Sequence, residues 1–97
     1  MRRAVLIELS STPERVLERL HQIDPVRYAT GGVLVKGGPC WLAALVAHEL
    51  GHPARWVAVW SPKDGAFRVV SRHHPEAPSE GTLVEENEVV ITDRLVL

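Results

Sequence analysis

The sequence predicts an α/β fold of the α+β kind, with the element order β-α-β-α-β-β-β and two helices packed on a mixed sheet. In the first sixty residues, short β-branched runs alternate with helical patterns. The residues that follow contain only strand patterns, turns and one proline-rich loop. With 97 residues, the chain has the length of a single domain, residues 1–97.

The first strand and helix are predicted from the opening residues. Residues 3–9 are rich in Val, Leu and Ile and indicate a buried strand. Thr12-Pro13-Glu14 is typical of a helix start, with a hydroxyl cap, a proline in the first turn and an acid beside it. We expect this helix to end at Asp24-Pro25. Its apolar stripe consists of Val16, Leu17, Leu20 and Ile23.

The second strand and helix are separated by a glycine turn. Gly31-Gly32 precedes the strand Val33–Val35, and Gly37-Gly38-Pro39 turns the chain into a helix from Cys40 to Leu50. This helix is apolar on nearly all sides, so we expect it to be largely buried. Gly51 and Pro53 should end it.

The rest of the chain predicts strands. Residues 55–60 and 66–71 indicate two strands joined by a turn at 61–65. Residues 73–81 indicate a loop, because they contain two prolines and no apolar period. Residues 83–84 and 89–97 indicate one or two last strands around an acidic turn at 85–88. Trp56 and Trp60 should share one face of their strand.

Composition excludes several classes of protein. The chain has 11 basic and 12 acidic residues and a net charge of −1, which argues against a binder held on long duplex nucleic acid by bulk charge. The single cysteine excludes an internal disulfide and a multi-cysteine zinc site. We expect Cys40 to be a packing residue. No apolar run has membrane-spanning length, so we expect a cytoplasmic protein without a membrane partner.

His48-Glu49-Leu50-Gly51-His52 matches the H-E-x-x-H pattern of zinc hydrolases, in which two histidines hold Zn²⁺ and the glutamate activates water. The early helix end and the lack of a third histidine at the metzincin spacing argue against that function. A structural pair of histidines at a helix end is the alternative.

Two further motifs are weaker. Gly37 and Gly38 lie between a strand and a helix, where backbone N–H groups can bind a phosphate, although a plain tight turn is the more common explanation. Arg72, His73 and His74 follow a strand, where histidines can ligate a metal or transfer protons, although such residues are often only solvated.

An ordered series of residues from 35 to about 74 resembles the Csx-three family of CRISPR-associated proteins. The family pattern runs roughly G-R-G-P-I-W-L, then L-x-H, a nearby His, and W-V-A-V-Y-D-P-R-L-G-A-V-V-V-x-S-H. The matching segments are Gly38–Leu42, Val46–His48, His52, Trp56–Lys63, Gly65-Ala66, Val69 and Ser71.

The resemblance implies a domain distantly like the cyclic-oligoadenylate sensor domains of type III CRISPR systems, assembled as homodimers or homotetramers. It also implies Mn²⁺-dependent cleavage of phosphodiester bonds in RNA 3′ ends or cyclic oligoadenylate, which switches off an antiviral signal. The family's first catalytic position is His52, with His48 matching its helix histidine. Its aspartate position holds Ser61, so Asp64 is the alternative carboxylate, and Lys63 replaces an arginine.

The family's last histidine position falls on Arg72 without gaps, and a one-residue bulge brings His73 into place. The predicted metal ligands are therefore His52, Asp64 and His73, and the predicted catalytic residues are His52, Lys63 and His73. The predicted ligand-binding residues are Gly37, Gly38, His48, Ser61, Lys63 and Arg72. Three functions stay open: a CRISPR-associated protein that binds or cleaves these nucleotides, a zinc hydrolase, and a non-catalytic binding or assembly protein.

Overall fold

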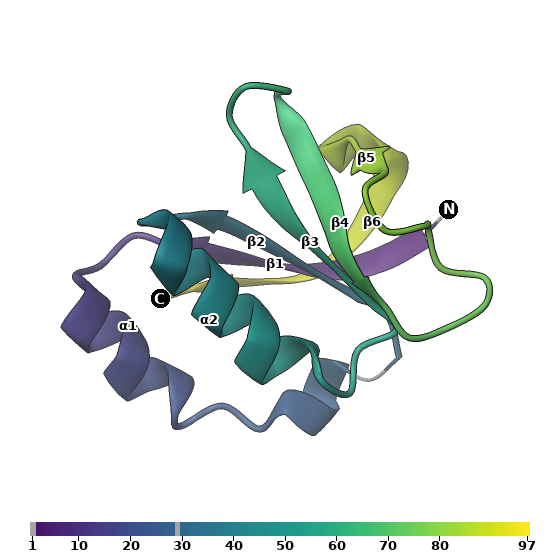
Figure 1. Cartoon of the computed structure of the whole chain (residues 1–97). Helices are drawn as coiled ribbons and strands as arrows, with labels where there is room; N and C mark the ends of the chain where they lie inside the picture. Colours follow the sequence, from purple (N-terminus) through teal and green to yellow (C-terminus); the bar gives the residue numbers. More distant parts are fainter. Residues whose placement is uncertain (1, 29) are drawn as a thin grey trace.

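A six-stranded mixed sheet forms the centre of the molecule (Figure 1). The computed structural model describes residues 2–28 and 30–97. The strand order is β5-β4-β3-β2-β1-β6; β1 pairs in parallel with β2 and β6, β2 in parallel with β3, and β4 antiparallel to β3 and β5. The predicted mixed sheet is confirmed. Its strands are β1 (Arg2–Leu9), β2 (Gly32–Gly37), β3 (Trp56–Ser61), β4 (Ala66–Arg72), β5 (Leu83–Val84) and β6 (Val89–Val96).

Two helices, α1 (Pro13–Leu20) and α2 (Cys40–Gly51), cover one face of the sheet (Figure 1). The predicted cap of α1 is confirmed: the Thr12 hydroxyl accepts a hydrogen bond from the Arg15 N–H at 3.4 Å. The helix ends at Leu20, earlier than predicted, because the N–H groups of Gln22 and Ile23 bond only three residues back. Ile23 still packs on the core, and a 3₁₀ helix (Pro25–Tyr28), which the sequence did not indicate, follows.

The expectation that α2 is largely buried is wrong for one of its faces. Leu42, Val46 and Leu50 are fully buried, whereas Trp41 and Leu45 are 54% and 36% exposed. The helix lies on the sheet with one side only, and no described element covers its outer side. The expected packing role of Cys40 is wrong for the same reason, since that residue is exposed. Neither helix of the described chain has the length and apolar character that crossing a bilayer requires.

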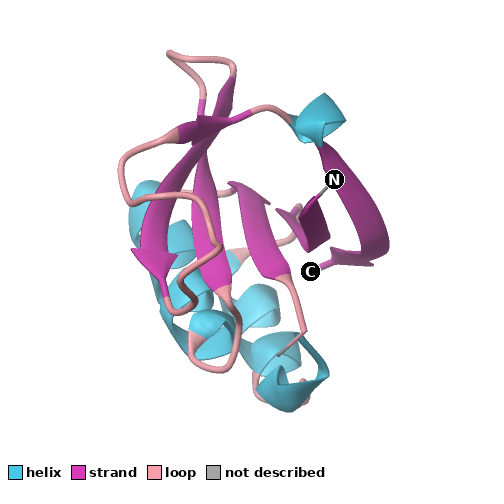
Figure 2. Ribbon diagram, turned by 90° about the vertical axis from the view of Figure 1, so that its right-hand side faces the viewer, coloured by secondary structure: helices cyan, strands magenta, loops and turns pink. Residues whose placement is uncertain are grey.

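The face of the sheet that the helices do not cover is buried because the sheet curls over on itself. In the order observed, β5 and β6 lie at opposite edges, and a flat sheet would separate them by roughly 24 Å. Only residues 85–88 join them, a connection that spans about 17 Å at most. The sheet therefore curls until its edges approach, as Figure 2 shows.

The curl encloses a second core with its own set of side chains. Trp56 and Phe67 are buried there, and the half-buried Trp60 packs against them, which confirms that the two tryptophans share a face. Gly32 permits this packing, because a Cβ at that position would lie 2.2 Å from the Trp56 ring. The sequence predicts one or two last strands; the structure has two, which run in the same direction and form the two edges of the sheet.

Candidate functional site

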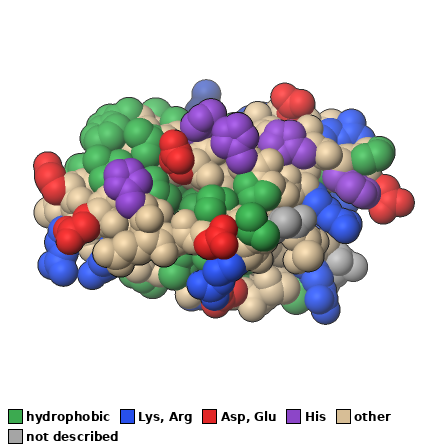
Figure 3. Space-filling model, turned by 90° about the horizontal axis from the view of Figure 1, so that it is seen from below, with side chains coloured by type: hydrophobic (Ala, Val, Ile, Leu, Met, Phe, Trp, Pro, Cys, Tyr) green, Lys and Arg blue, Asp and Glu red, His purple; other side chains and the backbone are tan. Residues whose placement is uncertain are grey.

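Three histidines line one groove between α2 and the β3–β4 pair. The groove has a volume of about 460 Å³, and His48, His52 and His73 lie in its wall together with apolar side chains such as Val59 and Val70. We call it the histidine groove. Figure 3 shows histidine side chains side by side on one face of the molecule, with Lys and Arg side chains near one end of the row. The structure thus brings together three of the predicted site residues from two different regions of the chain.

A β-bulge in β4 places His73 in this groove. Val57 pairs with Ser71, but Ala58 pairs with Val69, so Val70 is an extra residue. The extra residue leaves Ser71 opposite Val57, whose side chain belongs to the core under the helices. Side chains alternate along a strand, so Ser71 and His73 both face α2. The assignment of the family's last histidine position to His73 stays a prediction, and the bulge is a feature of β4 that leaves His73 facing α2.

Hydrogen bonds hold the His73 ring in one tautomer. Its Nδ1 lies 3.0 Å from the Ala54 carbonyl oxygen, which can only accept, so Nδ1 carries the proton. Its Nε2 lies 3.0 Å from the Ser71 hydroxyl and, in the neutral ring, accepts from it. The lone pair of Nε2 is therefore available as a base once the hydroxyl turns away.

His48 and His52 belong to the last turn of α2. The helix extends further than expected, because His52 retains helical dihedral angles of −51° and −51° as the capping residue. The two rings meet edge to face with their centroids 4.7 Å apart. At Gly51 the helix comes so close to β3 that a Cβ would lie 2.4 Å from a Val57 methyl carbon. The exposed Glu49 is outside the lining of the histidine groove.

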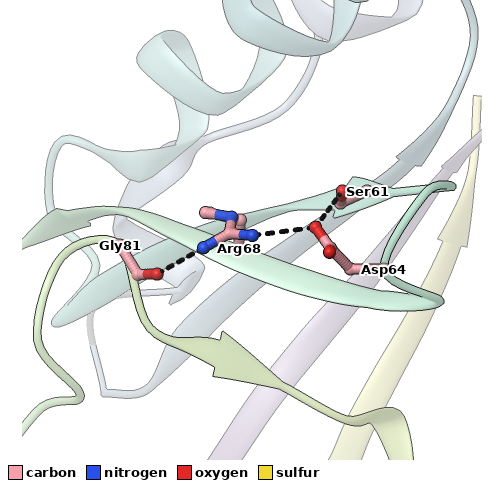
Figure 4. Close-up of polar contacts among 4 residues, drawn as sticks. All are labelled: Ser61, Asp64, Arg68 and Gly81. Atoms are coloured by element: carbon pink, nitrogen blue, oxygen red, sulfur yellow. Dashed lines mark hydrogen bonds and ion pairs between the residues drawn. The ribbon is translucent and has the colours of Figure 1, made fainter.

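The predicted carboxylate lies elsewhere, at the tip of the β3–β4 hairpin (Figure 4). Asp64 Oδ2 accepts hydrogen bonds from the Ser61 hydroxyl at 2.7 Å and from the Arg68 guanidinium at 2.8 Å. Arg68 also donates to the Gly81 carbonyl at 2.8 Å. The Ser61 hydrogen bond, and after it that of Arg68, lowers the pKa of Asp64 below its ordinary value. Lys63 lies exposed in the same turn.

The remaining predicted ligand-binding residues are also outside the histidine groove. Gly37 and Gly38 have φ angles of 94° and 68° and precede the N-terminus of α2, about 15 Å along the helix from His48. A Cβ on Gly37 would lie 2.8 Å from the Leu9 carbonyl oxygen, so the turn itself explains this glycine. Arg72 donates to the carbonyl oxygens of His74 and Pro75 and orders the loop after β4.

The predicted metal ligands are divided between two places. His52 and His73 line the histidine groove, and Asp64 does not. Within residues 2–28 and 30–97, no three His, Cys, Asp or Glu side chains are grouped closely enough to hold a metal ion. The described residues of one chain therefore do not group the three predicted ligands for Mn²⁺, nor place a third ligand beside His48 and His52 for Zn²⁺.

The sequence reasoning missed a second groove, of about 520 Å³, at the edge of the sheet where the parallel strands begin. Its cationic side chains are Arg2, Arg3 and Arg55, with His74 beside them, and we call it the arginine groove. Arg2 and Arg3 open β1, and Arg55 directly precedes β3. The sequence signal for this groove was arginine at the starts of two strands, β1 and β3, which are both parallel neighbours of β2.

A family model described as CRISPR-associated protein (Cas_csx3) matches residues 8–85. The match covers well over half of the chain and includes α2, the β3–β4 hairpin and all three residues of the histidine groove. A comparison with curated proteins found no match.

Proposed function

The chain belongs to the Cas_csx3 family of CRISPR-associated proteins, and on that premise we propose that it binds cyclic oligoadenylate or an RNA 3′ end and cleaves a phosphodiester bond at the histidine groove. The observation that carries this proposal is the bulge-positioned His73, in one tautomer, facing the same groove as His52. In this function the protein acts in the cytoplasm and ends a type III antiviral signal by destroying the nucleotide that carries it.

The groove supports acid–base chemistry by two histidines. One imidazole, with His73 Nε2 as the available base, takes the proton of a ribose 2′-hydroxyl. The 2′ oxygen then attacks the adjacent phosphorus, and the bond from phosphorus to the 5′ oxygen breaks. The second imidazole, His52, gives its proton to the leaving 5′ oxygen. The products are a 2′,3′-cyclic phosphate and a 5′-hydroxyl, so every proton and electron pair is accounted for.

We further propose that the active form contains two or four copies of the chain. The groove is open and lacks a carboxylate, whereas Asp64 lies at the hairpin tip of the same chain. A neighbouring copy can bring its own tip to a groove that one chain cannot complete. Mn²⁺, if it binds this family member, would then supply a Lewis acid that stabilises charge on the phosphate.

The experiment incubates labelled cyclic tetra-adenylate with the wild-type chain, with and without Mn²⁺. We expect cleavage to fall about 10²–10⁴-fold in His73→Ala and in His52→Ala, the usual contribution of a general acid or base. His21→Ala is the matched control, because His21 is an exposed histidine at the end of α1 outside the groove.

Analysis of the product ends reports the chemistry directly, since a 2′,3′-cyclic phosphate requires attack by the 2′ oxygen. Equal rates in the two groove variants and the His21 control would contradict the proposal. Activity that needs Zn²⁺ and disappears in Glu49→Ala would support a zinc hydrolase instead.

A further inference from the structure

The arginine groove gathers positive charge from three separate segments of the chain. Arg2 and Arg3 lie in β1, Arg55 precedes β3, and the backbone of Thr30 and Gly31 leads into β2 between them. Neighbouring parallel strands begin at the same edge of a sheet, and β1, β2 and β3 are such neighbours. The groove therefore results from the strand order. It opens where β1, β2 and β3 begin, at the opposite end of β3 from the hairpin tip.

Its cations are not neutralised within the described part of the chain. The ion pairs found there join Arg68 to Asp64 and Arg94 to Glu8, so neither Arg3 nor Arg55 has a carboxylate partner among residues 2–28 and 30–97. Arg2 donates to the backbone oxygen of Glu76 at 3.0 Å, and Glu76 also lines the groove. Three guanidinium groups against one carboxylate leave a net positive charge, which attracts anions.

His74 adds a further donor to the same groove. Its Nδ1 accepts a hydrogen bond from the Glu76 N–H at 3.2 Å. In the neutral ring the proton is therefore on Nε2, which can donate to an anionic oxygen.

A buried hydroxyl without a partner lies in the adjoining hollow. This hollow, of about 200 Å³, shares Arg3, Thr30 and Gly31 with the arginine groove and is also lined by Tyr28 and Arg27. Tyr28 is 3% exposed, and its hydroxyl has no hydrogen-bond partner in the described part of the chain. Burial raises the pKa of Tyr28, so the hydroxyl stays protonated and can donate. An unpaired buried donor is costly, and an acceptor oxygen of a ligand would satisfy it.

The two grooves lie on opposite faces at the same end of the sheet, and the chain passes from one to the other at consecutive residues after β4. His73 lines the histidine groove, and the next residue, His74, lines the arginine groove. The His73 N–H donates to the Arg55 carbonyl at 2.8 Å, which joins the end of β4 to the segment that carries the Arg55 side chain.

We propose that the arginine groove is a second binding site, which holds phosphodiester groups of the same RNA or cyclic oligonucleotide whose scissile bond lies in the histidine groove. This inference rests on the proposed function for the identity of the anion. Guanidinium groups bind phosphate oxygens through paired hydrogen bonds, and the substrate carries a phosphate at every nucleotide. The arginine groove thus supplies affinity and register, and the histidine groove supplies chemistry.

The test measures binding separately from cleavage. The probe is tetra-adenylate methylated at its 2′ oxygens, which cannot undergo attack by those oxygens, and its Kd is measured at several NaCl concentrations. We expect the double variant Arg3→Gln/Arg55→Gln to bind the probe at least about tenfold more weakly at low salt. The slope of log Kd against log NaCl concentration should fall by about two. The matched control is Arg15→Gln/Arg19→Gln, which removes two arginines from α1, outside both grooves.

An NMR signal from the groove itself provides a second measurement. The indole N–H NMR signal of Trp56, which lines the arginine groove, should shift on addition of the probe to the wild type and stay unmoved in the Arg3/Arg55 variant. Equal Kd values in the two double variants, or no binding by the wild type at micromolar protein, would overturn the inference. If affinity depends on Arg3 and Arg55 while wild type cleaves nothing, the inference is supported and the proposed cleavage fails. If affinity does not depend on them while His73→Ala abolishes cleavage, the reverse holds.

Discussion

The two ends of the β3–β4 hairpin use polar side chains in opposite ways. At its tip, Ser61, Asp64 and Arg68 bond to one another, and Arg68 also reaches the Gly81 carbonyl (Figure 4). At its base, the His73 ring bonds to Ala54 and Ser71. The neighbouring rings of His48 and His52 meet each other edge to face, and neither makes a hydrogen bond within the described residues. At the tip, the polar side chains bond to one another, whereas at the base the histidine rings line a groove that a ligand can enter.

This difference shows why the family pattern alone does not locate the chemistry. The aspartate position of the family corresponds to Ser61, where the side chain completes a local network with Asp64. At the base, the strand accommodates Val70 as an extra residue, which leaves His73, the predicted match for the last histidine position, facing α2. The predicted position at the tip therefore differs in side chain, whereas the predicted position at the base depends on backbone geometry.

The largest expected effect comes from deleting Arg72. The deletion would move His73 into the place of Arg72, opposite Trp56, whose side chain lies in the other core. A shift of one residue places a side chain on the opposite face, so His73 would leave the histidine groove. We expect cleavage to fall about 10²–10⁴-fold, as for loss of a general base, measured on labelled cyclic tetra-adenylate.

Deletion of Val70 is the matched control for the Arg72 deletion. It removes the extra residue of the bulge and leaves Ser71 opposite Val57 and His73 facing α2. We expect its activity to stay within a few-fold of wild type. Equal activity in the two deletion variants would show that cleavage does not depend on the face that His73 occupies.

A smaller effect is expected at the tip from Ser61→Asp, which restores the carboxylate of the family pattern. The new carboxylate would lie beside Asp64 and repel it, so the Tm at pH 7 should fall without metal. We expect added Mn²⁺ to raise both the Tm and the cleavage rate of this variant more than those of wild type. Ser61→Asn, of similar size and without charge, is the control. A Tm and rate that respond to Mn²⁺ equally in both variants would show that the tip takes no part in metal binding.

The smallest expected effect is the pH dependence contributed by Asp64. Because the folded protein lowers the pKa of this carboxyl, its contribution to stability is present above the ordinary value near 4 and is lost as pH falls through the folded value. Asp64→Asn should therefore lower the Tm at pH 7 and have less effect below about pH 4. Glu80→Gln, at an exposed acid without an ion pair in the described chain, provides the reference. A difference that is unchanged between pH 7 and pH 3 would show that the Asp64 hydrogen bonds do not stabilise the fold.

Much of the fold could be predicted from local patterns. The cap at Thr12, the glycine turn at Gly37-Gly38 and the β-branched strands depend on residues close in sequence, and the structure has all of them. The exposed side of α2 could not be predicted, because an all-apolar helix has the same pattern whether one layer or two cover it. The predicted packing role of Cys40 is wrong for this reason.

The sequence by itself determined the order of the two helices and the first four strands, the spacing of the two histidines at the end of α2, and the resemblance that the family match bears out. Only the tertiary structure decided which groups meet. It joined His73 to His48 and His52, kept Asp64 at the far end of the hairpin, and gathered Arg2, Arg3 and Arg55 at one edge. The physical reason is that spacing along a chain sets which side of an element a residue occupies, whereas strand order, the bulge at Val70 and the curl of the sheet set which sides face each other.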